Sequence, residues 1–303
     1  MYGLIDEEAY SKIVKAGKIA SRIRRYALSK VKPGIRVYDF CEEIEKKIVE
    51  EGGKPAFPCN ISINNVAAHY TPYVGDSSTI PEESIVKIDI GVHIDGYIAD
   101  TAVTVSFNPK YDDLLLAVET ALERAVETIR PGIRVSKIGE VIEKTIKSYG
   151  YKPIRNLSGH SIERYNLHSG VSIPNISEVF NLSRISPGHV YAIEPFGTNG
   201  VGYVVEGGEA FIYSLIREKK VKNELAKKLV NEVKRKYDGL PFAERWLRNV
   251  VNERSTLVNV LRVLVKSKIL HKYPVLLEAS GGVVAQFEHT VLVLEREVIV
   301  TTL

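Results

Sequence analysis

The sequence predicts an α/β (α+β) fold made of two similar halves, with antiparallel strands and one helical insertion. Three observations predict this fold. Two apolar strands meet at an Asp-Gly dipeptide, which is typical of a two-residue β-hairpin turn. A segment of the first third of the chain recurs 98 residues later. A basic segment with helical periodicity interrupts the strand pattern in the last third.

Composition places the chain in the globular class. It has 303 residues, of which 45% are hydrophobic and 26% charged, as in ordinary soluble domains. No apolar run approaches the roughly 20 residues that cross a membrane, and the first residues lack the layout of a signal peptide. The two cysteines, Cys41 and Cys59, are too few for a disulfide framework. We therefore expect a cytoplasmic protein that has no membrane partner.

The N-terminal third begins with a helix and the first copy of the repeat. Asp6 to Ala27 carries apolar residues at helical spacing. Pro33 to Val37 then recurs as Pro131 to Val135, and Lys54-Pro55 recurs as Lys152-Pro153. Each copy reads as a turn, an amphipathic helix and a glycine-containing stop. We expect two structurally similar halves, and a site placed between them would draw on both.

The hairpin that follows carries one aspartate on each strand. With Asp95-Gly96 as its loop, Asp89 pairs with Ala102 and Asp100 with Gly91. Because side chains alternate between faces, both aspartates lie on one face. Two buried carboxylates this close repel each other unless a proton or a cation lies between them. A solvated face would be the alternative, but the surrounding isoleucines and valines leave little polar surface, so we favour a site.

Three further residues extend this site. His160 lies in the polar, glycine-containing stretch Ser158 to Gly170, which we expect to be a loop, and Glu194 ends an apolar strand. Glu288 lies in a strand predicted over Val283 to Leu294. Taken singly, each has an ordinary explanation as a loop or exposed residue. Together with the two aspartates they give one histidine and four carboxylates, which suit two divalent ions bridged at about 3.5–4 Å.

The basic segment stands apart from the rest of the chain. Ile216 to Lys272 holds 16 Lys and Arg against 6 Asp and Glu, a balance of +10 in a chain whose total is +4. Its pattern is helical, and strand patterning stops near Leu215 and resumes near Val275. We expect an insertion subdomain over residues 215–274. Such asymmetry favours a surface that faces an anionic partner, although a solvated helical lid would show the same pattern.

Six ordered motifs resemble one family, the methionine aminopeptidases of type 2 in their short, archaeal-like form. They are AAHYTP, KIDIGVHIDGYIADTA, GHSIERYNLHSG, AIEPFG, LPFAERWL and AQFEHTVLV. The resemblance runs from about Ala56 to Val293, and the helical segment matches the insertion of that family. It implies the pita-bread fold, with two pseudo-symmetric halves around a central antiparallel sheet. Residues 1–214 and 275–303 would then form the metallopeptidase catalytic domain.

The resemblance also implies a role for each ligand. Asp89 would chelate the first of two divalent metal ions, Asp100 and Glu288 would bridge them, and His160 and Glu194 would hold the second. The metals could be Co, Mn, Fe or Zn. Glu194 would also act as the general base for a water that attacks the first peptide bond.

Further residues would bind the substrate. The resemblance implies that His69 and His168 contact the substrate backbone and stabilise the tetrahedral intermediate. A methionine pocket would draw on Phe57, Leu167, Phe196 and Tyr273.

The resemblance implies metal-dependent removal of the N-terminal methionine from nascent polypeptides, with preference for a small second residue. We further expect a monomer, with ribosome association through the basic insertion. A Xaa-Pro aminopeptidase or prolidase would share the five ligands, but those relatives resemble longer chains with an extra domain, and they lack the insertion. Only about 55 residues precede Ala56 here. A non-catalytic relative that binds ribosome or nucleic acid would usually have lost ligands, and none is lost.

Overall fold

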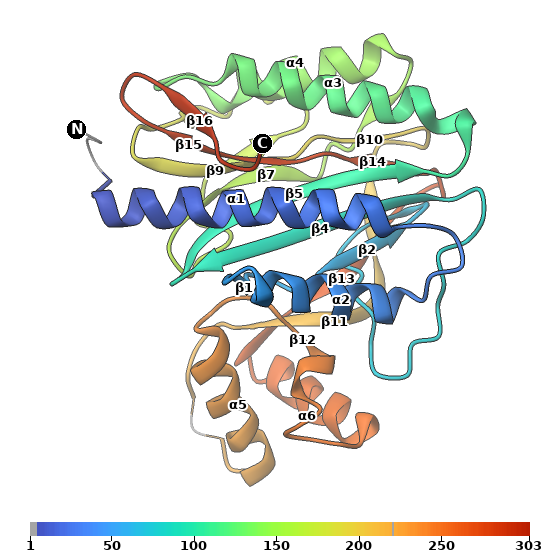
Figure 1. Ribbon diagram of the computed structural model, residues 1–303, viewed down its shortest axis with the longest axis vertical. Helices are drawn as coiled ribbons and strands as arrows, with labels where there is room; N and C mark the ends of the chain where they lie inside the picture. The colour runs from blue at the N-terminus through green and yellow to red at the C-terminus, as the bar shows by residue number, and fades with distance from the viewer. Residues whose placement is uncertain (1–4, 220) are drawn as a thin grey trace.

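The computed structural model describes residues 5–219 and 221–303 (Figure 1). The helices are α1 (Glu7–Lys30), α2 (Val37–Glu50), α3 (Asp112–Thr128), α4 (Val135–Ser148), α5 (Glu224–Tyr237) and α6 (Arg254–Lys266), with short 3₁₀ helices η1 (Pro109–Tyr111) and η2 (Glu244–Leu247). The strands are β1 (Lys54–Pro55), β2 (Asn60–Ile63), β3 (Val66–Ala68), β4 (Ile85–Ile94), β5 (Tyr97–Ser106), β6 (Lys152–Pro153), β7 (Ser158–Ile162), β8 (Ser172–Pro174), β9 (His189–Ile193), β10 (Phe196–Thr198), β11 (Val204–Leu215), β12 (Phe242–Ala243), β13 (Leu270–Glu278), β14 (Val284–Gln286), β15 (His289–Val293) and β16 (Val298–Val300). Within these described ranges, no helix is long and apolar enough to cross a bilayer.

The predicted repeat is a structural repeat. Helices α2 and α4 begin and end 98 residues apart, and so do the short strands β1 and β6. The turn before each helix uses a glycine in the left-handed region, Gly34 with φ +83° and Gly132 with φ +82°, a conformation that glycine adopts without steric cost. The prediction of two similar halves is therefore confirmed.

The hairpin has the predicted register. Asp89 pairs with Ala102, Gly91 with Asp100, and Ile94 with Tyr97. The two loop residues have φ of 49° and 87°, as a type I′ turn requires. Helix α1 packs across both strands of this hairpin (Figure 1).

The described residues form four antiparallel sheets. Strand β4 pairs with β1, β2 and β5; the second half contributes the five-stranded order β16-β15-β9-β7-β8 and the small sheet β14-β10-β6; and a fourth sheet has the order β12-β11-β13-β3. Hydrogen bonds join the halves directly: Thr104 Oγ1 donates to the carbonyl of Gln286, and the Glu288 amide donates to the carbonyl of Ala102 at 3.0 Å. Strands β5, β14 and β15 therefore meet along the seam between the halves.

One stretch that we predicted as a loop, and a second whose composition is typical of a loop, form strands. Ser158 to Ile162 is β7 because it pairs with β8 on one side and β9 on the other. Asn60 to Ile63 is β2 because it pairs with β4. Tertiary pairing overrides a local composition rich in polar residues and proline.

Two predicted boundaries are also wrong. The single strand predicted over Val283–Leu294 is broken between β14 and β15. At the break, the amides of Phe287 and Glu288 donate to the carbonyls of Pro195 and Ala102, outside the pairing of β14 with β10 and of β15 with β9. Strand β13 begins at Leu270 and continues through Tyr273-Pro274, whereas we expected strand patterning to resume only near Val275. Pro274 is accommodated because the pairing of β11 with β13 shifts register around Ala210.

Helices α5 and α6, which come between β11 and β13 in the chain, form a lobe at one end of the molecule (Figure 1). Helices α5 and α6 lie below the sheets in Figure 1 and pack on β11 and β13. Its apolar residues form a cluster of their own, which includes Leu229, Val233, Leu247, Leu257 and Leu261. The helices of this lobe are therefore stabilised largely because their apolar faces pack against one another.

Candidate metal centre

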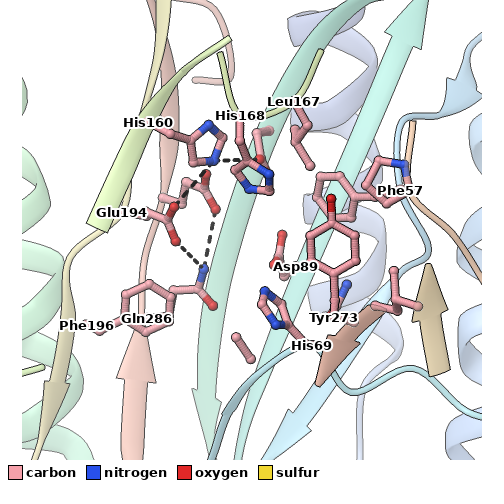
Figure 2. A pocket seen from close by; sticks show the side chains of 16 residues that line it. Phe57, His69, Asp89, His160, Leu167, His168, Glu194, Phe196, Tyr273 and Gln286 are labelled. Atoms are coloured by element: carbon pink, nitrogen blue, oxygen red, sulfur yellow. Dashed lines mark hydrogen bonds and ion pairs between the residues drawn. The ribbon is translucent and has the colours of Figure 1, made fainter. Parts of the chain in front are cut away.

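One pocket at the seam contains every predicted site residue (Figure 2). These are Phe57, His69, Asp89, Asp100, His160, Leu167, His168, Glu194, Phe196, Tyr273 and Glu288. The sequence prediction missed five further lining residues, Asn60, Ala68, Ile212, Pro241 and Gln286. The pocket draws on both halves and on strands β11 and β13, which supply Ile212 and Tyr273.

The hairpin and β15 together position the first carboxylates. Asp89 lies on β4 and Asp100 on β5, each opposite a small residue. Thr290 fixes the Asp100 backbone, since its Oγ1 accepts from the Asp100 amide at 2.7 Å and donates to the Asp100 carbonyl at 2.7 Å. The amide of Glu288 bonds to Ala102, two residues along β5. These contacts hold Asp100 and Glu288 close together across the seam.

The second half supplies an imidazole and a further carboxylate. His160 lies on β7 and pairs with Ala192 on β9, and Glu194 follows the end of β9. The Nε2 atom of His160 is 3.5 Å from Glu194 Oε1 and 3.7 Å from Asp100 Oδ2. Gln286 Nε2 donates at 3.4 Å to both Glu194 and Glu288 (dashed in Figure 2). Gln286 therefore links two of the carboxylates.

These side chains fit a divalent cation. Asp89 Oδ1, Asp100 Oδ1 and Glu288 Oε1 are buried and have no hydrogen-bond partner among the described residues. Donor atoms of Asp100, His160 and Glu288 lie within 4.8 Å of one another. Buried carboxylate oxygens without donors are costly unless a cation or proton lies between them, and carboxylate with imidazole suits the first-row divalent metals.

Burial favours the protonated form of these carboxyl groups in the metal-free protein. It raises the pKa of Asp89 to about 7. Burial also raises the pKa of Asp100, with a further contribution from the charge of Asp89. The pKa values of Glu194 and Glu288 are raised mainly by burial and then by the neighbouring aspartates. In contrast, burial lowers the pKa of His160 to about 4, so its imidazole is neutral at pH 7, as a metal ligand must be.

Two histidines and a tyrosine flank the carboxylates. His69 has a left-handed backbone, φ 65°, and its Nδ1 donates to the carbonyl of Pro274 at 3.1 Å. The ring of His168 is 4.4 Å from that of His160, and the ring of Tyr273 is 5.6 Å from that of His69. Burial lowers the pKa of His69, and it lowers that of His168 to about 3, with help from neighbouring histidines. Figure 2 shows the two histidines on opposite sides of Asp89.

Sequence comparison decides the family. The sequence pattern of metallopeptidase family M24 matches residues 11–295. The chain belongs to metallopeptidase family M24.

The M24 chain has close relatives that bear the name methionine aminopeptidase. It is 48% identical over 290 residues to the one from Thermococcus onnurineus, covering 96% of this chain and 98% of the relative. It is 50% identical over 291 residues to the one from Pyrococcus horikoshii, with 96% and 98% covered. For Saccharolobus solfataricus the identity is 47% over 298 residues, with 98% of each chain covered. The resemblance to methionine aminopeptidases is therefore confirmed.

Solved structures show the same fold. A thermophilic Arx1 superposes with a TM-score of 0.86 at 19% identity, covering 98% of this chain and 91% of that one. A methionine aminopeptidase from Thermotoga maritima gives a TM-score of 0.71 at 22% identity, with 100% and 99% covered. The prolidase from Pyrococcus furiosus gives 0.64 at 18% identity, and this chain covers only 66% of it. At these identities the likeness concerns the fold, and it confirms the predicted pita-bread architecture.

The M24 pocket also has apolar walls. Phe57, Leu167 and Tyr273 gather on one side of the carboxylates in Figure 2, whereas Phe196 lies beside Gln286 on the other side. The ring of Phe57 lies against Gly91, where a Cβ atom would approach a ring carbon to 2.2 Å. A glycine opposite Asp100 is therefore needed for Phe57 to reach the site.

The missed residues left some signals in the sequence. Gln286 shares a face with Glu288 at period 2, and Pro241 belongs to the LPFAERWL motif. Asn60 could have been found only by assigning its stretch to a strand opposite Asp89. Ala68 and Ile212 carry no chemical signal that distinguishes them from core residues.

The raised carboxyl pKa values predict that metal binding releases protons. Protons held on the carboxyls of the metal-free protein at pH 6.5 must leave when the ionised oxygens bind a cation. Release falls as the pH rises above the raised pKa values, because the metal-free carboxyls are then already ionised. Calorimetric Mn²⁺ titration at pH 6.5 and 8.5, in two buffers of different ionisation enthalpy, measures this release. Binding heats that do not depend on the buffer at pH 6.5 would contradict it.

Proposed function

We propose that this M24 metallopeptidase is a methionine aminopeptidase, which removes the N-terminal methionine from peptides and nascent chains. The observation that carries the proposal is one pocket in which four carboxylates and His160 lie against an apolar wall. The name of the relatives at 48–50% identity supports the same substrate. An apolar pocket beside a metal site suits an unbranched thioether side chain.

The proposal assigns the metal ligands as the sequence predicted. Asp89, Asp100, His160, Glu194 and Glu288 would hold two divalent ions of the Co, Mn, Fe or Zn type. A bound ion supplies a nucleophilic water at neutral pH and polarises the scissile carbonyl. Glu194 would take a proton from the attacking water and pass it to the leaving amine. Gln286 orients Glu194 for this step, since its amide donates to Glu194 Oε2.

The flanking histidines would bind the peptide backbone. The Nδ1 atom of His69 donates to Pro274, so in the neutral ring Nε2 carries a lone pair and can accept from a substrate N–H. His168 is also neutral and can donate to the carbonyl oxygen as negative charge develops there. The rings of His69, His168 and Tyr273 crowd this part of the pocket. That crowding supports the proposed preference for a small second residue.

Hydrolysis of two peptides tests the proposal. Chelator-treated protein is resupplied with Mn²⁺ or Co²⁺, and free methionine is measured from Met-Ala-Ser and Met-Pro-Ser. We expect metal-dependent release from Met-Ala-Ser, reduced roughly 10²–10⁴-fold by Glu194→Gln, which is the usual size of a general-base contribution. The exposed Glu206→Gln on β11 is the matched control and should retain full activity.

Other results of that assay would point elsewhere. Release confined to Met-Pro-Ser would assign the chain to the proline-directed members of the fold. A folded protein that releases methionine from neither peptide with any metal would support a non-catalytic binding role.

The basic lobe, residues 215–274, is proposed as an insertion subdomain that brings the enzyme to the ribosome. Arg217 Nε donates to the carbonyl of Lys268, and Lys219 Nζ donates to the carbonyl of Ser267. These bonds bring Arg217, Lys219 and Lys268 to one corner near the end of α6, with Lys266 close by on its last turn. None of these four cations forms an ion pair with an acidic residue in the described ranges. We further propose that the protein is a cytoplasmic monomer.

Ribosome co-sedimentation tests the role of this corner. We expect binding at 50 mM salt that weakens strongly by 300 mM, because contacts with phosphates release counterions. The double variant Arg217→Glu with Lys268→Glu should abolish it, whereas Lys46→Glu with Lys144→Glu, on α2 and α4, should not. Binding that is insensitive to salt, or equal loss in both double variants, would contradict the proposal.

A further inference from the structure

Arg24 of α1 contacts the neighbours of both ligands that are proposed to bridge the metal ions. One nitrogen of its guanidinium, Nη1, lies 2.5 Å from Thr101 Oγ1 and 3.1 Å from His289 Nδ1. Thr101 directly follows Asp100 in the chain, and His289 directly follows Glu288. A single side chain thus holds the residue after each of two ligands that come from different halves of the molecule.

The alternation of side chains along β5 explains how Arg24 reaches this position. Asp100 lines the pocket, so Thr101 points to the other face of β5, which α1 covers (Figure 1). Arg24 is partly buried there, and its acceptors are a hydroxyl and an imidazole rather than a carboxylate. Burial lowers its pKa from the usual value. Because partial burial of a charge against neutral acceptors costs free energy, these two hydrogen bonds call for an explanation.

Donor chemistry fixes the direction of each bond. Arginine N–H groups can only donate, so Thr101 Oγ1 and His289 Nδ1 both accept from Arg24. The hydroxyl hydrogen of Thr101 is therefore directed elsewhere, and it is donated to the carbonyl of Glu288 at 2.9 Å. The amide of Glu288 donates to the carbonyl of Ala102 at 3.0 Å. Both backbone polar groups of Glu288 are thus bonded to β5, and Arg24 orients the donor of one of these bonds.

We propose that Arg24 is a positioning residue for the metal centre. By holding the residue after each ligand, it sets the spacing between Asp100 and Glu288, and that spacing decides whether the two carboxylates can bridge two ions. A guanidinium suits this role because its N–H bonds point in fixed directions, so that one residue of α1 can hold two strands at once. The inference rests on the proposed function, which assigns Asp100 and Glu288 as the bridging ligands.

The affinity for Mn²⁺ tests the inference without relying on turnover. Calorimetric titration of chelator-treated protein compares wild type with Arg24→Met, which removes the donor, and with Thr101→Val, which removes the hydroxyl that passes the contact on. We expect each variant to bind Mn²⁺ roughly 10–100-fold more weakly, the usual effect of losing a group that orients a metal ligand. The double variant should lose less than the product of the two single losses, because both changes interrupt the same chain of hydrogen bonds.

Two controls separate positioning from a general structural role. Arg25→Met changes the next residue of α1, whose Nη1 bonds within the helix to Ser21 Oγ at 2.9 Å, and Thr101→Ser keeps the hydroxyl. Both controls should bind Mn²⁺ as tightly as wild type. Urea unfolding of the metal-free proteins measures any loss of stability separately. If Arg24→Met fails to fold, Thr101→Val and its serine control carry the test.

Three results would overturn the inference. Wild-type Mn²⁺ affinity in Arg24→Met, with only a lower stability, would show that Arg24 merely packs α1 against the hairpin. Equal weakening by Arg25→Met would assign the effect to lost positive charge instead of to the contacts of Arg24. Fully multiplicative losses in the double variant would show that Arg24 does not act through Thr101. Failure of the proposed function is a separate result, because it would appear as absent methionine release from Met-Ala-Ser by the wild type.

Discussion

Asp100→Asn should lower metal-dependent peptide hydrolysis by roughly a thousandfold or more. Asp100 lies at the centre of the ligand set: its Oδ2 is 3.7 Å from His160, and its charge raises the pKa values of Glu194 and Glu288. An amide keeps the shape but loses the charge that a bridging ligand supplies. Metal-ion catalysis contributes several kcal/mol to the transition state, and each ~1.4 kcal/mol is a factor of ten in rate.

The same substitution should stabilise the protein when metal is absent. Burial and the charge of Asp89 raise the pKa of Asp100 above its unfolded value. The ionised group therefore destabilises the folded state once the pH exceeds that unfolded value near 4. At pH 8 the chelator-treated variant should melt a few degrees above chelator-treated wild type, at about 2–4 °C per kcal/mol. Added Mn²⁺ should raise the melting temperature of wild type but not that of the variant.

Scanning calorimetry with and without Mn²⁺ checks both predictions: that the metal-free variant melts above metal-free wild type, and that Mn²⁺ does not stabilise the variant. Asp39→Asn, at an exposed position on α2, is the matched control and should change neither the activity nor the metal response. A variant that still gains stability from Mn²⁺ as wild type does would show that Asp100 is not a metal ligand.

Arg245→Met should destabilise the protein by about 3–5 kcal/mol. The Arg245 side chain is fully buried in η2 and forms ion pairs with Glu45 and Glu42 of α2. It also donates to Thr71 Oγ1 and to the carbonyl of Pro72. Removing one partner of a buried ion pair leaves the other charge unpaired, and this usually costs 3–5 kcal/mol. The loss should appear in urea unfolding as a lower midpoint with an unchanged slope.

Arg245→Met should also affect catalysis, because Arg245 and its hydrogen-bond partners fix the two segments beside the pocket that carry Cys59 and Thr71. Thr71, two residues after His69, donates to the carbonyl of Cys59, and the Cys59 amide donates to Glu45. Adding Glu45→Gln should recover part of the stability, since it removes the unpaired charge and keeps the oxygen that accepts from Cys59. Arg235→Met breaks only an exposed pair with Glu232 and should cost less than about 1 kcal/mol. If Arg245→Met and Arg235→Met lowered the free energy of unfolding equally, burial of the Arg245 ion pairs would not be the cause of the loss.

The parts of the site that depend on local chemistry were predictable from the sequence. The Asp95-Gly96 turn fixes the hairpin register, and the register places Asp89 and Asp100 on one face without any knowledge of the rest of the fold. The 98-residue repeat likewise predicts two halves from residue identities alone. His160, Glu194 and Glu288 lie far apart in the chain; their chemistry suggested one ligand set, but only the family motifs gave each residue a role in it.

The errors in the predicted strands and in the predicted site have one physical origin. Strands β2 and β7 have the polar composition of loops and exist because β4 and β9 offer them backbone partners. Phe287 and Glu288 leave their strand because Pro195 and Ala102 accept their amide bonds. Asn60 was missed for the same reason, since its relation to Asp89 exists only once β2 is paired. Long-range backbone pairing is the part of the fold that local sequence patterns do not encode.

The wide separation of the ligands along the chain also sets the order in which the site can form. Asp89 and Asp100 are 11 residues apart in a hairpin, and isolated hairpins form in about 1–10 μs. The threonine that fixes Asp100 lies 190 residues further along, so its contact requires closing a very long loop, which is slow. A growing chain thus displays two carboxylates long before the imidazole and the remaining acids can join them. The complete set of proposed ligands can therefore assemble only after the C-terminal strands have been synthesised and have paired with the first half.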